Sequence, residues 1–170
     1  MLSKNIETAL NNQIRIEAES SQTYLSMASW AETHGLEGIS KFMYAQSEEE
    51  RVHMLKLVKY VNERGGHAKV SELKAPKISY GTFKEMFEEL YQHEIFVSDS
   101  INQLVHITFD EKDYATHNFL QWYVAEQIEE EAQAKLILDK INLIGDDKGG
   151  LYLFDRDIQQ IAVASAAAAK

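Results

Sequence analysis

The sequence predicts an all-α fold: a four-helix bundle with one long crossover and a short C-terminal fifth helix, in a single domain spanning residues 1–170. Pro76 is the only proline, and long stretches contain no residue that would break a helix. Apolar residues recur at intervals of three and four, and no segment alternates as a β-strand would. One connection between the predicted helices is much longer than the others.

The order of the elements follows from this periodicity and from the breaks in it. We expect four long helices over residues 5–33, 39–65, 82–110 and 115–143, and a shorter one over 155–165. Glycines stand where helices commonly end, at Gly35, Gly65 and Gly145. The bundle therefore occupies about residues 5–143, and the last helix leads into the alanine-rich sequence ASAAAAK.

The connection over residues 65–81 decides how the helices are joined. A helix of about 28 residues is roughly 42 Å long. The connection is long enough to reach about 55 Å when extended, so it can run the full length of a helix, whereas the other connections are too short. The three connections between the four helices are short, long and short in turn, which predicts two antiparallel hairpins joined by one crossover.

Composition excludes several classes of partner and site. The net charge is −10, from 27 Asp and Glu against 17 Lys and Arg, which argues against nucleic acids and anionic membranes and favours cations. The absence of cysteine excludes disulfides, thiolate metal sites and iron–sulfur clusters. No segment approaches the roughly 20 apolar residues of a membrane span, and none resembles a signal peptide. We therefore expect a cytoplasmic protein.

Each predicted bundle helix has an apolar stripe that a glutamate interrupts near its middle; these residues are Glu17, Glu50, Glu94 and Glu130. A single such glutamate is commonly at the stripe edge or paired with arginine. Four at matched depth would instead face one another, where burial and mutual repulsion each cost several kcal/mol. No Lys or Arg stands on the stripes at that level. Two divalent cations would balance the four charges.

The type of ligand narrows the choice of metal. His53 follows Glu50 by three residues, so both side chains lie on one helix face and can bind the same ion. Carboxylates with one imidazole suit iron or manganese better than a structural zinc ion, which favours thiolate and more imidazole.

These motifs resemble those of the non-haem ferritins of the prokaryotic type, over nearly the whole chain. The resemblance is carried by Glu17, Glu50-x-x-His53, Glu94 and Gln127-x-x-Glu130, and it implies a ferritin-like fold. The general di-metal motif of such bundles has a second Glu-x-x-His. Here the fourth helix has Gln127 and Glu130 but no histidine, so the two ions should have unequal surroundings.

The resemblance implies specific roles. Glu17, Glu50 and His53 would bind the first iron, with Glu50 bridging to the second. Glu94 and Glu130 would bind the second iron, with Gln127 as a ligand or a hydrogen-bond donor. Tyr24 matches a tyrosine that donates an electron or hydrogen-bonds a ligand, although core packing would also explain it.

A third iron position is also implied by the resemblance. The matching residues are Glu49, Glu126, Glu129 and Glu130, and a solvated acidic face is the alternative. Haem is not expected, because Arg51 stands where the haem-binding relatives have their axial methionine. We interpret the remaining histidines as surface or interface residues: His34, His67, His93, His106 and His117.

The function that the resemblance implies is iron storage with ferroxidase activity. Fe(II) would be oxidised by dioxygen or peroxide at the di-iron centre and stored as a hydrous Fe(III) oxide inside a homo-oligomeric cage of 24 subunits. One alternative keeps the di-iron site and gives it an organic substrate, as in soluble carboxylate-bridged oxygenases. Another is a non-catalytic helical scaffold whose glutamates face water.

Overall fold

The computed structural model describes the backbone of residues 1–168 and the side chains of residues 1–158. Its elements are α1 (Lys4–Thr33), α2 (Glu37–Glu63), α3 (Phe83–Asp110), α4 (Tyr114–Ile144) and α5 (Lys148–Ala168). The described residues contain no strand. The all-α prediction is confirmed, and the four bundle helices lie within two residues of their predicted bounds. The prediction of a short fifth helix over 155–165 is wrong in extent, because α5 begins at Lys148.

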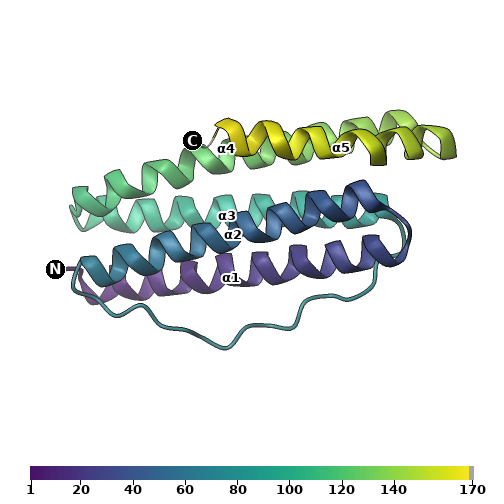
Figure 1. Cartoon of the computed structure of the whole chain (residues 1–170). Coiled ribbons are helices and arrows are strands. Elements are labelled where there is room, and N and C mark those ends of the chain that lie inside the picture. Colours follow the sequence, from purple (N-terminus) through teal and green to yellow (C-terminus); the bar gives the residue numbers. More distant parts are fainter. Residues whose placement is uncertain (169–170) are drawn as a thin grey trace.

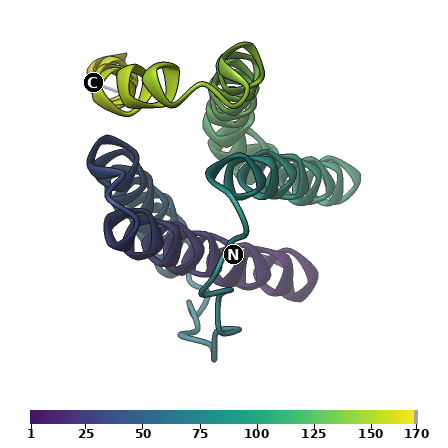
Figure 2. The same cartoon turned by 90° about the vertical axis from the view of Figure 1, so that its right-hand side faces the viewer.

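The helices form two hairpins, as the connection lengths predict. α1 packs against α2, and α3 packs against α4. The crossover between α2 and α3 runs the length of the bundle beside α1 (Figure 1). Seen end-on in Figure 2, the two hairpins lie next to each other, and α5 spans from the end of α4 to α2. This arrangement gives each bundle helix one face toward a common interior.

Side chains at the helix starts satisfy backbone N–H groups that have no partner within the helix. Ser3 accepts a hydrogen bond from the backbone nitrogen of Ile6 at the start of α1. Thr82 and Asp113 serve α3 and α4 in the same way. These short polar residues fix where the helices begin, and hence the depth at which their glutamates lie.

The start of α2 has no such residue of its own and is completed by α5. Leu36 precedes the helix and makes no side-chain cap. Instead, Asp155 Oδ1 accepts a hydrogen bond from the backbone nitrogen of Ile39 at 2.9 Å. The chains approach so closely that a Cβ atom on Gly38 would lie 1.6 Å from the backbone oxygen of Asp155. The longer α5 is therefore part of how α2 is positioned.

The crossover is held against α1 by side chains of that helix. Asn11 donates to the backbone oxygen of His67 at 3.1 Å and accepts from the backbone nitrogen of Lys69 at 2.6 Å. Farther along, Ser26 donates to the backbone oxygen of Lys77 at 2.7 Å. The extended segment thus satisfies part of its backbone without forming a strand.

The apolar core consists of two clusters. One contains Tyr24, Phe42 and Phe87, and the other contains Leu10, Leu57 and Tyr123. All four glutamates that interrupt the predicted stripes are buried. The glutamates are thus an acidic interruption within an otherwise apolar interior.

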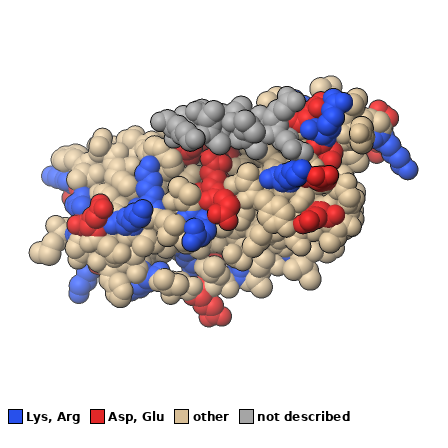
Figure 3. Space-filling model, viewed as in Figure 1, with Lys and Arg blue, Asp and Glu red and all other residues tan. Residues whose placement is uncertain are grey.

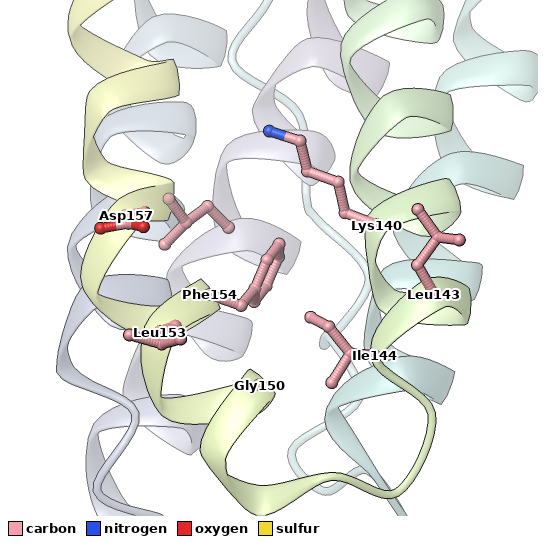
Figure 4. Close-up of a pocket in the computed structure, with 8 residues that line it drawn as sticks. Lys140, Leu143, Ile144, Gly150, Leu153, Phe154 and Asp157 are labelled. Atoms are coloured by element: carbon pink, nitrogen blue, oxygen red, sulfur yellow. The ribbon is translucent and has the colours of Figure 1, made fainter.

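A pocket of about 410 Å³ opens where α4 turns into α5. Figure 4 shows its lining, in which Ile144 of α4 and Phe154 of α5 point into the gap between the two helices, and Leu143 and Leu153 lie at its edges. Among the described helices, none is long and apolar enough to cross a membrane.

Candidate metal centre

Glu17, Glu50 and His53 meet in the interior between α1 and α2. One ligand atom from each lies within 4.8 Å of the other two, and all three side chains are buried. Nδ1 of His53 lies 3.7 Å from Oε2 of Glu50. Oε2 of Glu17 and Oε2 of Glu50 are buried without a hydrogen-bond partner. Two unpaired carboxylate oxygens beside an imidazole nitrogen form a donor set suited to a divalent cation.

Glu94 and Glu130 supply the buried carboxylates of α3 and α4. The hydroxyl of Tyr24 donates a hydrogen bond to Oε1 of Glu94. Nε2 of Gln127 donates to Oε2 of the same carboxylate at 3.2 Å. Glu94 is therefore held from both sides, by a helix of each hairpin.

Burial raises the pKa of all four glutamates, and it is the largest cause in each case. The pKa of Glu94 is raised to about 7, although its hydrogen bonds from Tyr24 and Gln127 act in the opposite direction. The charge of Glu94 also raises the pKa of Glu50 and of Glu130. These carboxylates resist ionisation together because burial and mutual repulsion outweigh the opposing charge of His53, which lowers the pKa of Glu17 and Glu94.

No Lys or Arg is buried among the side chains that the structure describes. The basic residues lie at the surface, mixed with acidic ones, and Figure 3 shows a group of acidic side chains about midway along the bundle. The buried carboxylates can therefore be neutralised by protonation or by a bound cation, and the donor set of Glu17, Glu50 and His53 fits a cation.

A second cluster involves the predicted third position. Ligand atoms of Glu49, His53 and Glu126 lie within 4.8 Å of one another, with both glutamates half-buried. Glu129, also predicted for this position, is exposed. Burial raises the pKa of Glu126, and the charge of Glu49 raises it further. Glu49 and Glu126 share His53 with the buried cluster of Glu17 and Glu50, so the two sets of ligands are contiguous.

Several side chains that support the glutamates are missing from the sequence-based prediction. Gln13 is 1% exposed and donates to Oε1 of Glu17 at 2.9 Å. Ser98 lies 3.4 Å from Nε2 of Gln127 and donates to Glu131. The position of Gln13 four residues before Glu17 was an available signal, because such residues are neighbours on a helix.

His53 is held by α4 as well as by its own helix. The hydroxyl of Tyr123 donates to the backbone oxygen of His53 at 2.8 Å, and the Trp122 ring makes a T-shaped contact with the imidazole at a centroid distance of 5.2 Å. Nζ of Lys56 lies 3.2 Å from the centroid of the Trp122 ring. Trp122 therefore packs directly on a proposed ligand.

The other histidines divide into two groups. His34, His67 and His106 are exposed, as predicted. His93 and His117 are half-buried, so neither lies on the open surface, and their assignment as surface or interface residues stays a prediction. His93 forms a 2.7 Å hydrogen bond with Ser20 Oγ and packs edge-on against Tyr24. This contact was not visible from the sequence because His93 lies beside the stripe of its helix.

Comparisons with known proteins agree with this geometry. The family described as "Ferritin: Ferritin-like domain" matches residues 7–144. A probable bacterial non-heme ferritin-like protein of Haemophilus influenzae is 46% identical over 162 residues, which cover 95% of this chain and 98% of that protein. A bacterial non-heme ferritin of Campylobacter jejuni is 45% identical over 164 residues, covering 96% and 98%.

A solved structure shows the same arrangement of helices. The open pore ferritin of Archaeoglobus fulgidus superposes with a TM-score of 0.92 at 43% identity, covering 94% of this chain and 98% of the archaeal chain. On the family match, the relatives and the shared fold, this chain belongs to the ferritin family.

Proposed function

We propose that this chain stores iron: it oxidises Fe(II) at the paired buried site and holds the Fe(III) product as a hydrous oxide. Iron is here the substrate and the cargo. The first ion would be bound by Glu17, Glu50 and His53, and the second by Glu94 and Glu130. Gln127 would orient Glu94, to which it already donates a hydrogen bond.

One observation supports this proposal most directly. Oε2 of Glu17 and Oε2 of Glu50 are buried, lack hydrogen-bond partners and lie in the cluster that includes His53. A buried, unpaired carboxylate oxygen is costly. A chain that keeps two of them together accepts a less stable metal-free state, which a bound cation would relieve.

The chemistry balances with dioxygen as the oxidant. Two Fe(II) ions each lose one electron, and one dioxygen molecule gains both and two protons to give hydrogen peroxide. Carboxylates favour the harder Fe(III) product, and water supplies the oxide and hydroxide of the mineral. A bundle that brings two ions to one place provides both electrons in a single encounter.

We also propose two finer features. Glu49, Glu126, Glu129 and Glu130 would form a third iron position, which ions occupy before they enter the di-iron centre or after they leave it. The proximity of Glu49 and Glu126 to His53 supports this position. The subunits would assemble as a cage of 24, since the chain aligns over 94% of its length with a protein described as an open pore ferritin.

The test is anaerobic loading of metal-free protein with Fe(II), followed by stopped-flow mixing with oxygenated buffer. Glu50→Ala and His53→Ala should slow oxidation by at least about 10–100-fold, since even outer-shell changes at metal sites cost that much. Glu48→Ala, on the exposed face of α2, is the matched control. Variants that match the parent rate would place the chemistry elsewhere.

Particle size and iron content separate the alternatives. A large assembly that accumulates many irons per subunit supports storage. A small oligomer that retains only its bound pair would favour an oxygenase with an organic substrate, and a protein that binds no iron would favour a scaffold. Light scattering with metal analysis distinguishes the three.

A further inference from the structure

Gln13 is a buried amide whose nitrogen and oxygen each have a hydrogen-bond partner, one of which belongs to the metal centre. Its side chain is 1% exposed and lies one helical turn before Glu17 on α1. Nε2 donates to Oε1 of Glu17 at 2.9 Å. On the other side, Ser100 Oγ of α3 donates to Oε1 of Gln13 at 2.7 Å. The amide therefore links a serine of the second hairpin to a carboxylate of the first.

The orientation of this amide is set by chemistry. With a cation bound, Glu17 would be ionised and could only accept hydrogen bonds, so the NH₂ group of Gln13 then faces Glu17. The carbonyl oxygen then faces Ser100, whose hydroxyl can donate to it. Reversing the amide would place two acceptors against each other at Glu17. The carboxylate thus fixes which end of Gln13 it meets, and Ser100 supplies a donor for the other end.

The two oxygens of Glu17 are consequently unequal. Oε1 is engaged by Gln13, whereas Oε2 is buried without any partner. Because a free glutamate side chain can rotate and bind an ion through one oxygen or two, a donor fixed on one oxygen restricts that choice.

We propose that Gln13 is a positioning residue: it holds Oε1 of Glu17 and presents Oε2 alone to the cation, with Ser100 locking the amide in place. This inference rests on the proposed function, because it requires that a cation binds at Glu17. Gln13 itself does not touch the ion. Its effect is to make Glu17 a one-oxygen ligand of fixed direction.

Co(II) is a suitable probe, because its visible absorption changes in intensity with the number of ligand atoms around the ion. Gln13→Met keeps the length and the packing of the side chain and removes the donor. We expect Co(II) affinity, measured by titration of metal-free protein, to fall about 10–100-fold. The absorption per bound ion should also fall as Glu17 becomes free to bind through both oxygens. Ser100→Ala should shift both quantities in the same direction by a smaller amount.

Asn11→Leu is the matched control for the loss of a buried amide. Asn11 is 8% exposed, lies on the same helix and bonds to the crossover rather than to a ligand. It should lower the melting temperature while leaving the Co(II) spectrum and affinity at parent values. A folded Gln13→Met protein with the parent spectrum and affinity would overturn the positioning role alone. A parent protein that binds no Co(II) would overturn the proposed function and this inference together.

Discussion

The hydroxyl of Tyr24 on α1 donates a hydrogen bond to Oε1 of Glu94 on α3, joining the two hairpins at the level of the candidate metal centre. Burial and the neighbouring charge of Glu94 raise the pKa of Tyr24, so its hydroxyl keeps its proton. Of the roles that the resemblance implies for Tyr24, this contact supports the hydrogen bond to a ligand. Electron donation by Tyr24 stays a prediction.

Tyr24→Phe tests what the hydrogen bond contributes. Without the hydroxyl, Glu94 is held by Gln127 alone. We expect the affinity for one of two Zn(II) ions to fall about tenfold, as for other partners of metal ligands, with the other ion little affected. Isothermal titration calorimetry of metal-free protein measures both. Tyr44→Phe removes an exposed hydroxyl bonded to Glu32 and is the control; equal losses in the two variants would argue against a specific role.

Glu50→Gln should stabilise the metal-free protein. The substitution removes a buried carboxylate whose pKa is raised by burial and by the charge of Glu94. We expect the free energy of unfolding to rise by roughly 0.5–2 kcal/mol, the usual scale of a single stabilising substitution. Urea unfolding with and without Zn(II) measures the effect, and the added ion should stabilise the variant less than the parent. A variant less stable than the parent without metal would mean that Glu50 has partners that offset its burial.

The metal-free protein should lose stability as the pH rises from about 4.5 to 7. The pKa of Glu94 is raised from 4.5 to about 7, so the folded state binds more protons than the unfolded state within this window. Stability then falls with pH, by roughly 3 kcal/mol for this group alone. The free energy of unfolding of Glu94→Gln should fall less steeply with pH than that of the parent. The exposed Glu48→Gln is the control for the loss of one carboxylate. Zn(II) should reverse the trend, because its binding displaces protons.

The sequence predicted the bundle well because the required signals are local. Apolar spacing and the glycine stops determine four helices, and the length of residues 65–81 determines their connection. The depth of Glu17 and its three counterparts followed from the same spacing. The start of α5 at Lys148 was missed because the turn after Gly145 and the glycines at 149 and 150 read as a longer break. Its packing on α2 depends on tertiary contacts.

The surroundings of the glutamates were harder to predict. Gln13 bonds to Ser100, which is 87 positions away in sequence, and Tyr24 reaches Glu94 across 70. Helical periodicity states which residues share a face, but it does not state which polar pairs meet between helices. His93 illustrates the same limit, since its partner Ser20 belongs to another helix.

Lys112→Gly should stabilise the turn between α3 and α4. Lys112 has a φ angle of 58°, and it is the only non-glycine residue with positive φ in the part of the chain that the structure describes. The left-handed conformation costs a residue with a Cβ atom roughly 1–2 kcal/mol, and glycine avoids this cost. We expect a gain of about 1 kcal/mol in urea unfolding. Lys112→Ala, which removes the charge and keeps the Cβ atom, should show no comparable gain; an equal gain would point to the charge instead.

Gly38→Ala should destabilise the contact between α2 and α5. The new Cβ atom would lie 1.6 Å from the backbone oxygen of Asp155, so the two helices would have to separate and the bond from Ile39 to Asp155 would lengthen. We expect a loss of about 1–3 kcal/mol, the scale of overpacking in a tight interior. Gly149→Ala is the control: its Cβ atom would meet only the side chain of Asp147 at 3.5 Å. Because alanine favours a helix more than glycine does, this control should unfold at the parent midpoint or above it. If both variants unfold alike, α5 does not pack on α2 closely enough to require glycine at position 38.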